Sequence, residues 1–591
     1  MLSRRQQSPR SRGPATRRSA ATSRRTPEPQ QAASLQRPAP VPPAGDAEAA
    51  QAVPASQAPR RPARPAASQG STRPTRPPRP KPATTVEAVK RRQRQPETAA
   101  QSRPRGLSLR AAAGPRPAGG LHPLSDAAAN ARLYEYESSV KGAFDDIVPV
   151  LKKVASERCE PDFVERAQRI ARAELGFELP GHILDEAWIN GLDMRRLFAW
   201  SVFERYRRVS DAFFSDDPLG GLDGADFQRF LQECGFHLMD ITPCADGRLA
   251  HAISYVLRLP YGPVRRKSYA GSLFDIENTV EKWVETELLR FREGRPNTAD
   301  EPTRYLKAVV YHFSSVDPAH QGCAAHGSND EAAAREGWER LRAFRQAVEN
   351  GFCCGASVDL LLIGMDTDTD AIRVHVPDAD GYCDLDHWLD AAKVYEITRG
   401  QSAAEGRARI GELVRAHAPG KAAGKGAGGP DDGMVRLVAQ LIENNLSQID
   451  YVRQYHGGHY ADIGHAERFI GVGIGFEEIQ LRNLTYFAYL STVEEGAKDL
   501  DVGIKIFTGL NISRGLPAPI VVRYDYHGSV PGARERAVQH CERIAMALKA
   551  RYPKLCADGQ LHCLRAVRDC DAQAPIEIVG SSLDPAAPAG H

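Results

Sequence analysis

The residue pattern with the clearest chemical meaning is Cys244, Asp246 and Arg248, which alternate within five residues of the 591-residue chain. A cysteine thiolate at the first position can bind a metal, and a carboxylate two residues later can reach a water on that metal. The arginine guanidinium can then hold the carboxylate in a bidentate ion pair. The alternation therefore predicts metal-assisted chemistry on a short turn that Gly247 loosens.

Two further metal-ligating residue types lie downstream of this turn. The apolar residues 306–311 predict a strand that ends at His312, and Cys323 follows eleven residues later. One histidine and two cysteines form a three-ligand zinc set that leaves the fourth tetrahedral position open to water. Because structural zinc sites are usually closed by four protein ligands, the open position favours a catalytic zinc held by Cys244, His312 and Cys323.

Each of these residues also has an ordinary structural explanation. Cys244 could be a buried thiol, and His312 could be a core imidazole. Asp246 and Arg248 could form a surface ion pair. Taken singly, those explanations are favoured for each residue. Their joint occurrence in this order, with the histidine at a strand end, favours the metal site instead.

The elements that position the site are predicted from apolar periodicity. Residues 125–216 are predicted to be helical, because apolar residues recur at helical spacing within 147–154 and 194–200. From about residue 222 helices alternate with short strands, and a Gly/Ala/Pro-rich linker then precedes a long helix near 434–452. The clearest predicted strands are residues 309–311, 359–363, 372–376, 469–474, 502–506 and 519–524.

Charge divides the chain into two unlike parts. Residues 1–120 hold 24 Lys and Arg against 5 Asp and Glu, a net charge of +19, and 21 of the 42 prolines but no aromatic residue. Such a segment cannot bury enough apolar surface to offset its ordering entropy, so we predict that it is disordered. The rest of the chain has 53 Lys and Arg against 69 Asp and Glu, a net charge of −16, and is long enough for two or three cores.

The predicted fold class is therefore α/β (mixed α+β). The expected order is a disordered Arg/Pro-rich tail (1–120), a helical domain (121–218), a zinc-binding catalytic domain (219–418), a flexible linker (419–431) and a C-terminal domain (432–591). Residues 308–318 and 520–531 resemble each other weakly, which predicts that the last domain repeats the catalytic one without its metal ligands.

Composition argues against several protein classes. No apolar run approaches the length of a bilayer span, so no transmembrane helix is expected. The basic start lacks the apolar region of a secretory signal, and its prolines argue against the helix of a transit peptide. The eleven scattered cysteines indicate a reducing compartment rather than a disulfide framework.

Cys-x-Asp-x-Arg followed by a strand-end histidine and a cysteine resembles the zinc site of β-class carbonic anhydrases. Within that class, the chain looks like a member of the carboxysome shell carbonic anhydrase family, with a helical leader and an extra C-terminal domain. Residues 312–318, 465–469 and 508–514 carry this closer match, and the resemblance covers about residues 125–580.

The resemblance implies one Zn²⁺ per chain and reversible hydration of carbon dioxide to bicarbonate and a proton. In the expected mechanism a zinc hydroxide is the nucleophile. Asp246, kept ionised by Arg248, accepts its hydrogen bond and directs it, and Arg248 also prevents Asp246 from becoming a fourth ligand. Three histidines, His251, His326 and His465, are candidates for carrying the proton away, although each has a structural explanation as well.

His320 is an alternative to His312 as the zinc ligand. Ordinary β-class enzymes separate the histidine and cysteine ligands by two residues, and His320 precedes Cys323 with that spacing. His312 fits the strand-end position and the longer spacing of the shell enzymes. We favour His312, because a strand end fixes an imidazole better than an insert that contains Asp317 and Pro318.

The resemblance also implies a location and partners. It places the chain in the carboxysome lumen, associated with the shell, in the bacterial cytoplasm, where it supplies carbon dioxide to Rubisco. The basic tail is expected to dock on Rubisco or on shell proteins, and a homodimer or larger homo-oligomer is expected. A non-catalytic zinc-stabilised scaffold and a polyanion-binding protein led by its tail are the alternatives; the open zinc position disfavours the first, and the acidic remainder disfavours nucleic acid as a partner.

Overall fold

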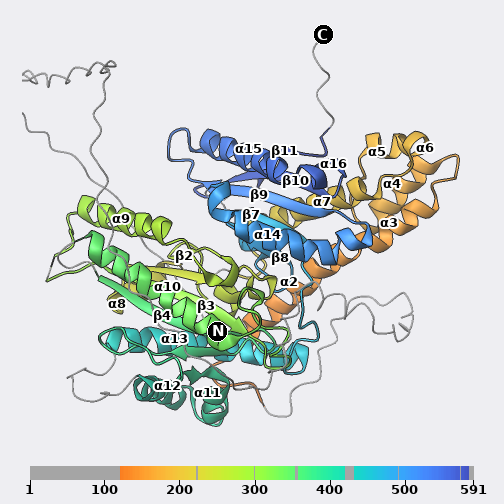
Figure 1. Ribbon diagram of the computed structural model, residues 1–591. Coiled ribbons are helices and arrows are strands. Elements are labelled where there is room, and N and C mark those ends of the chain that lie inside the picture. Colours follow the sequence, from red (N-terminus) through yellow and green to blue (C-terminus); the bar gives the residue numbers. More distant parts are fainter. Residues whose placement is uncertain are drawn as a thin grey trace, which may run out of the picture. The chain divides into compact units, whose positions relative to one another are not determined.

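The computed structural model describes residues 120–220, 224–298, 300–352, 357–418, 431–489, 492–572 and 574–584 (Figure 1). Nearly all of the tail that we predict to be disordered, and all but the last residue of the predicted linker, lie outside the described residues. The described chain folds as the predicted α+β mixture, with two sheets that are mostly parallel.

The longer helices are α2 (Ala127–Asp145), α3 (Ile147–Ser156), α4 (Phe163–Glu174), α7 (Met194–Ser215), α8 (Gly224–Glu233), α9 (Ile276–Arg292), α10 (Asp330–Gly351), α11 (Ala391–Thr398), α12 (Ala403–His417), α13 (Asp432–His456), α14 (Val493–Leu510) and α15 (Ala533–Arg551). Short helices are α5 (Gly181–Asp185), α6 (Ala187–Asn190) and α16 (Pro553–Ala557). The strands are β1 (Leu238–Pro243), β2 (Val264–Arg266), β3 (Arg304–Phe313), β4 (Ser357–Asp366), β5 (Ile372–His375), β6 (Leu389–Asp390), β7 (Phe469–Gly473), β8 (Thr485–Ala488), β9 (Ala518–Tyr526), β10 (Leu561–Asp569) and β11 (Glu577–Ser581).

The first sheet has six strands in the order β2-β1-β3-β4-β5-β6, and the first four of these are parallel. Side chains alternate between its faces, as the period of a strand requires. Val309 packs with α10 on one face, whereas Ala308 and Val310 belong to a core with α13 on the other. Figure 1 shows α9 and α10 on one side of this sheet and α11, α12 and α13 on the other.

The second sheet repeats the first. Its order is β8-β7-β9-β10-β11, with four parallel strands followed by an antiparallel one. Strands β2-β1-β3-β4-β5 have the same order and directions, which supports the predicted relationship between the two domains. Helices α14 and α15 cover one face of the second sheet, and the N-terminal helices pack with Phe469, Val521 and Leu564 on the other.

One predicted strand is wrong. Residues 502–506 belong to α14, whose apolar side chains recur at helical spacing. Leu500, Ile504 and Phe507 are buried in the core of the second sheet, and Gly503 lets the helix approach Tyr486, since a Cβ there would lie 2.8 Å from that ring. Within residues 502–506 the apolar side chains of Val502, Ile504 and Ile506 alternate as in a strand, and five residues are too few to reveal the helical period.

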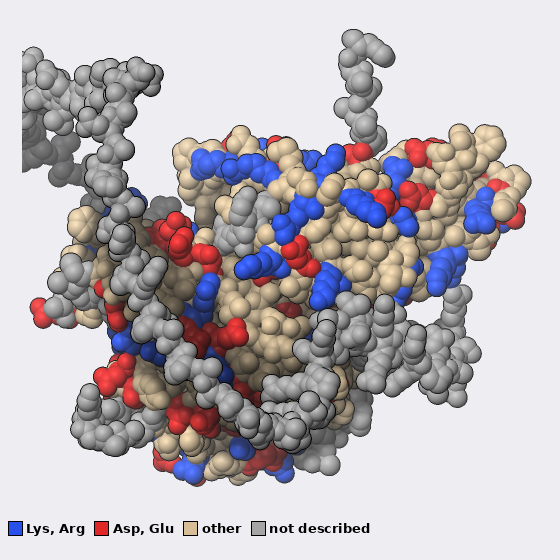
Figure 2. Space-filling view, in the orientation of Figure 1, with Lys and Arg blue, Asp and Glu red and all other residues tan. Residues whose placement is uncertain are grey.

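Surface charge is mixed in sign. Figure 2 shows Lys and Arg next to Asp and Glu over one face of the molecule. Several exposed arginines are paired with carboxylates, such as Arg551 with Asp501 and Arg534 with Glu577. Within the described residues, no helix is long and apolar enough to span a membrane.

Candidate metal centre

The Cys244–Arg248 turn begins directly after β1. The Cys244 backbone N–H donates to the Val310 carbonyl on β3, which continues the ladder by one residue. Asp246 then caps the short 3-10 helix Gly247–Leu249 by accepting a hydrogen bond from the Arg248 N–H at 3.0 Å. An aspartate at such a cap favours the sharp turn that brings its carboxylate back toward the strand end.

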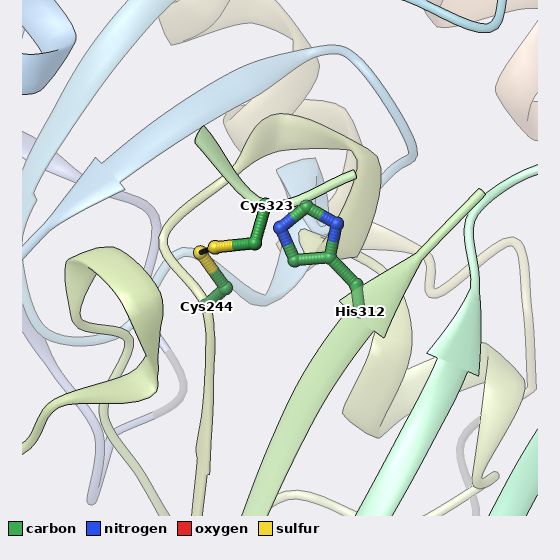
Figure 3. A group of neighbouring side chains, drawn as sticks. All are labelled: Cys244, His312 and Cys323. Carbon is green, nitrogen blue, oxygen red and sulfur yellow. Dashed lines mark hydrogen bonds between the residues drawn. The ribbon is translucent and has the colours of Figure 1, made fainter. Parts of the chain in front are cut away.

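The other two predicted ligands meet Cys244 at the carboxyl end of the sheet, where ligand sites of parallel sheets usually lie. His312 is near the end of β3, and Cys323 immediately precedes the 3-10 helix Ala324–His326. The sulfur atoms of Cys244 and Cys323 are 4.0 Å apart, and the ring of His312 is turned toward them (Figure 3). Their ligating atoms all lie within 4.8 Å of one another.

This donor set fits a zinc ion. Two thiolates about 2.3 Å from a tetrahedral zinc would have sulfur atoms about 3.8 Å apart, close to the observed separation. His312 is fully buried, yet neither of its ring nitrogens has a hydrogen-bond partner among the described residues. A buried imidazole without partners is costly unless something absent from the protein chain itself satisfies it.

The two thiols also favour a cation between them. The hydrogen bond with Cys323, together with burial, raises the pKa of Cys244 well above its ordinary value, whereas the same contact lowers the pKa of Cys323 despite burial. One of the pair therefore loses its proton more readily than the other. Both become thiolates only with a compensating positive charge, which a metal ion supplies.

His320, the alternative ligand, lies elsewhere. Its side chain is 66% exposed, and its Nδ1 atom is 2.8 Å from the carboxylate of Asp317 in the same loop. It is not among the described residues that gather around the two cysteines.

The predicted Asp246–Arg248 pair is present, buried and bidentate. Arg248 donates through Nε to Asp246 Oδ1 at 2.9 Å and through Nη2 to Oδ2 at 2.6 Å. Burial opposes ionisation of the carboxyl, but the Arg248 guanidinium outweighs burial and holds the pKa of Asp246 well below its usual range. Asp246 Oδ2 is 3.7 Å from His312 Nε2, so an ionised carboxylate lies beside the candidate metal ligands.

A second group of side chains faces the same carboxylate, and the sequence indicated only part of it. His465 Nε2 is 3.9 Å from Asp246 Oδ2, and His465 Nδ1 is 2.9 Å from Oε1 of Glu467. Glu467 is not among the site residues predicted from the sequence. Its only signals are its position two residues after a candidate histidine and its place in the 465–469 segment that carries the family resemblance.

Of the three candidate proton carriers, His465 alone is both near Asp246 and partly exposed. Its side chain is 27% exposed, and although burial opposes protonation, Glu467 and Asp246 raise the pKa of His465. The buried His251 bonds to Asp370, and His326 bonds to the Gly271 carbonyl.

The second sheet has other residues at the matching positions. Ile474 donates its N–H to the Arg523 carbonyl as Cys244 does to Val310, so Ile474 corresponds to Cys244 and Asp525 to His312. Arg523 is fully buried there and pairs with Glu478 at 2.7 Å and Asp525 at 2.6 Å. A guanidinium thus supplies the positive charge at this position of the second sheet.

Comparison with known proteins identifies all three regions. Residues 122–214, 226–465 and 466–583 match the N-terminal, catalytic and C-terminal domain families of the carboxysome shell carbonic anhydrase. The chain is 60% identical over 475 residues to the carboxysome shell carbonic anhydrase of Parasynechococcus marenigrum, covering 80% of each chain. It is 58% identical over 477 residues to that of a Prochlorococcus marinus strain (80% of this chain, 91% of the relative).

A more distant relative gives the same answer. The carboxysome shell carbonic anhydrase of Halothiobacillus neapolitanus is 48% identical over 464 residues, which cover 78% of this chain and 90% of the relative. The chain therefore belongs to the carboxysome shell carbonic anhydrase family and is a carbonic anhydrase.

Proposed function

We propose that the chain hydrates carbon dioxide reversibly to bicarbonate and a proton at a zinc ion held by Cys244, His312 and Cys323. The observation that carries the proposal is the buried His312, which lacks hydrogen-bond partners among the described residues and faces two thiols beside an ionised carboxylate. When bound, zinc acidifies a water to a pKa of about 7, so that a strong nucleophile is available near neutral pH.

Asp246 and Arg248 direct that nucleophile. The carboxylate of Asp246 accepts the hydrogen bond of the attacking oxygen, which turns an oxygen lone pair toward the carbon of carbon dioxide. Arg248 keeps Asp246 ionised and occupies both carboxylate oxygens, so that Asp246 does not become a fourth ligand. A new carbon–oxygen bond gives bicarbonate, a water replaces it, and one proton must leave the site.

His465 is the side chain that we propose for this proton. It lies between Asp246 and solvent, and it is partly exposed. A proton reaching its ring has a direct route to bulk water, which the buried His251 and His326 do not offer.

The test uses residues 121–591 and two single variants. We expect the parent chain to bind one zinc and to hydrate carbon dioxide rapidly in stopped-flow measurements. His312→Ala should lose both zinc and turnover, because two cysteines alone hold the metal weakly. His320→Ala should keep both, because its side chain points into solvent.

The two variants also separate the alternatives. Loss of zinc only in His320→Ala would overturn the proposed ligand set. Zinc bound by the parent chain without any turnover would overturn the proposed reaction and leave the metal as a structural element.

The chain is associated with the carboxysome, because its relatives are named carboxysome shell carbonic anhydrases. We propose that it works on the luminal side of the shell, where it converts bicarbonate to carbon dioxide for Rubisco, and that it acts there as a homodimer or larger assembly. The net charge of +19 in residues 1–120 supports a role of this segment in docking on Rubisco or shell protein.

Removal of the tail tests this docking. At moderate salt we expect full-length chain, but not residues 121–591, to co-purify with Rubisco, and high salt should abolish the association because it screens exposed charges. A full-length variant with the arginines of residues 60–80 replaced by glutamine is the matched control and should also lose Rubisco. Undiminished co-purification of residues 121–591 would rule the proposal out for Rubisco.

A further inference from the structure

We propose that the C-terminal domain completes the site in the catalytic domain by holding the backbone of Gly247, with Glu467 and Asn483 as positioning residues. This inference rests on the proposed function of Asp246 and Arg248, the two neighbours of Gly247. It assigns a task to the repeat whose own matching positions are filled by Arg523 and its carboxylates.

Both polar backbone atoms of Gly247 bond to the segment that leads into and through the second sheet. Its N–H donates to Oε1 of Glu467 at 3.2 Å, and its carbonyl accepts from the backbone N–H of Asn483 at 2.7 Å. A third contact joins the neighbouring Arg248, whose Nη1 donates to the carbonyl of Ile463 at 3.2 Å. The turn that carries the ion pair is therefore held by Glu467 and Asn483 of the C-terminal domain and by Ile463, which lies just before that domain.

The fit between Gly247 and Glu467 is close. A Cβ at position 247 would lie 2.5 Å from Oε1 of Glu467, nearer than real Cβ atoms approach. Glycine thus allows the carboxylate to reach the backbone, a use of glycine that differs from mere flexibility. Glu467 is itself buried, and its Oε2 atom has no hydrogen-bond partner among the described residues.

Asn483 is also fixed in place. Its φ of +57° lies in the left-handed region, which asparagine tolerates better than most residues. Its side-chain amide donates to Asp462 Oδ2 and to the Gly464 carbonyl, each at 2.9 Å. These bonds set the direction of the backbone N–H that meets Gly247.

The consequence for catalysis is geometric. Displacement of a catalytic group by about 1 Å can reduce the rate about a hundredfold. A short turn with a central glycine has little rigidity of its own, so contacts to the peptide groups on either side of Gly247 fix where Asp246 points. The C-terminal domain is then required for turnover although it supplies no metal ligand in the proposal.

The main experiment compares Glu467→Ala with Glu467→Gln. The glutamine keeps an acceptor for the Gly247 N–H, so we expect its kcat to stay within about threefold of the parent, whereas alanine should lower kcat about tenfold or more with zinc retained. Hydrogen–deuterium exchange of the peptide spanning Gly247 should show protection lost only with alanine. Unchanged protection and turnover in Glu467→Ala would overturn the proposal.

Glu478→Gln is the matched control, because Glu478 is a buried carboxylate of the same domain that pairs with Arg523. It should leave kcat and Gly247 protection unchanged even if it lowers thermal stability. A tenfold loss of kcat in Glu478→Gln would mean that any change of a buried charge in this domain impairs the enzyme. The positioning role proposed for Glu467 would then fail.

Substitutions of Asn483 test the same proposal independently. Glu467 also contacts His465, whereas Asn483 meets Gly247 through its backbone N–H. Asn483→Gly keeps a left-handed backbone and should be milder than Asn483→Val, whose branched side chain disfavours that conformation. If Glu467→Ala does not fold, this pair carries the test. Equal kcat and equal Gly247 protection in the two Asn483 variants would contradict the proposal.

A double-mutant cycle connects the effect to the ion pair. In an Asp246→Ala background, Glu467→Ala should lower kcat by no more than about twofold further, because both changes remove the same contribution. A full tenfold further loss would show that Glu467 acts elsewhere. If Asp246→Ala alone retains turnover, the proposed function fails. Hydrogen–deuterium exchange of the peptide spanning Gly247 still tests separately whether Glu467 and Asn483 hold this turn.

Discussion

Asp246→Ala is expected to lower kcat for carbon dioxide hydration about a hundredfold or more while the protein keeps one zinc per chain. Asp246 is not among the three proposed ligands, but its carboxylate lies 3.7 Å from His312. Without it, the nucleophile forms as before but is no longer directed toward carbon dioxide. Stopped-flow hydration combined with zinc analysis of the same sample measures both quantities.

The control for this variant concerns Arg248. Removing Asp246 leaves a buried guanidinium without its carboxylate partner, and breaking a buried pair destabilises a protein by about 3–5 kcal/mol. Asp246→Asn keeps the shape and an acceptor oxygen, so it should unfold at a higher temperature than Asp246→Ala while still losing most turnover. Turnover like that of the parent chain in either variant would refute the role of Asp246.

The charge of Asp246 is expected not to change over the pH range in which the enzyme is assayed. Burial opposes its charge, but Arg248 prevails and places the pKa of Asp246 well below the ordinary value of about 3.9. A carboxyl whose pKa is lower in the folded than in the unfolded protein stabilises the fold fully at pH values above its unfolded-state pKa. That contribution is lost as the pH falls toward the pKa of the same carboxyl in the folded protein. Between pH 5 and 8 Asp246 therefore stays ionised.

The proposed metal ligands could be predicted because sequence-local features determine them. Cys244 and Cys323 combine a distinctive residue type with turns, and His312 follows an apolar run that ends where the sheet ends. Parallel strands bring their carboxyl ends to one edge, so Cys244 and His312, 68 positions apart, are expected to meet there from strand direction alone. Cys323 lies in the loop after β3, and strand direction does not place it. His312 and Cys244 lie on neighbouring strands of that edge.

Other features could not be predicted because they depend on contacts across the two domains. Glu467 and Asn483 follow Gly247 by more than 200 residues and belong to the segments around the second sheet. The local sequence does not assign either residue to the site, although Glu467 lies in the 465–469 segment that carries the family resemblance. Residues 502–506 of α14 are predicted as a strand because Val502, Ile504 and Ile506 alternate with Gly503 and Lys505, and only the packing of the helix on the sheet decides between the two.

The repeat illustrates a similar limit. The weak sequence similarity sets residues 308–312 against 520–524 and so pairs His312 with Tyr524, one position before the structural counterpart, Asp525. A shift of one residue along a strand moves a side chain to the other face of the sheet. The register of the two sheets corrects this alignment and reveals that an arginine–carboxylate cluster stands where the first sheet gathers its proposed metal ligands.

Cys244→Ala is expected to abolish zinc binding and to reduce carbon dioxide hydration to the background rate. Cys244 is the proposed ligand that follows β1, its sulfur lies 4.0 Å from that of Cys323, and it also accepts the Gly271 N–H at 3.3 Å. Two remaining ligands form an incomplete set for zinc, and without the metal no water is acidified at neutral pH.

Thermal unfolding gives this prediction a second readout and a matched control. A metal that binds only the folded state stabilises it, by about 2.7 kcal/mol at a hundredfold excess over its Kd. Zinc added to metal-free parent chain should therefore raise Tm, whereas Cys244→Ala should not respond. Cys234→Ala removes a buried thiol of the same core that lies outside the ligand group, so it should keep zinc, turnover and the rise in Tm.

Zinc binding is expected to depend on pH. Contact with Cys323 and burial raise the pKa of Cys244, so binding to the parent chain must displace protons from the thiols, and zinc affinity should fall as the pH is lowered. Proton release measured by calorimetry in buffers of different ionisation enthalpy should exceed that of any residual binding in Cys244→Ala. Stoichiometric zinc in Cys244→Ala, or full hydration activity without zinc, would disprove the proposed centre, because each contradicts the requirement for this thiolate.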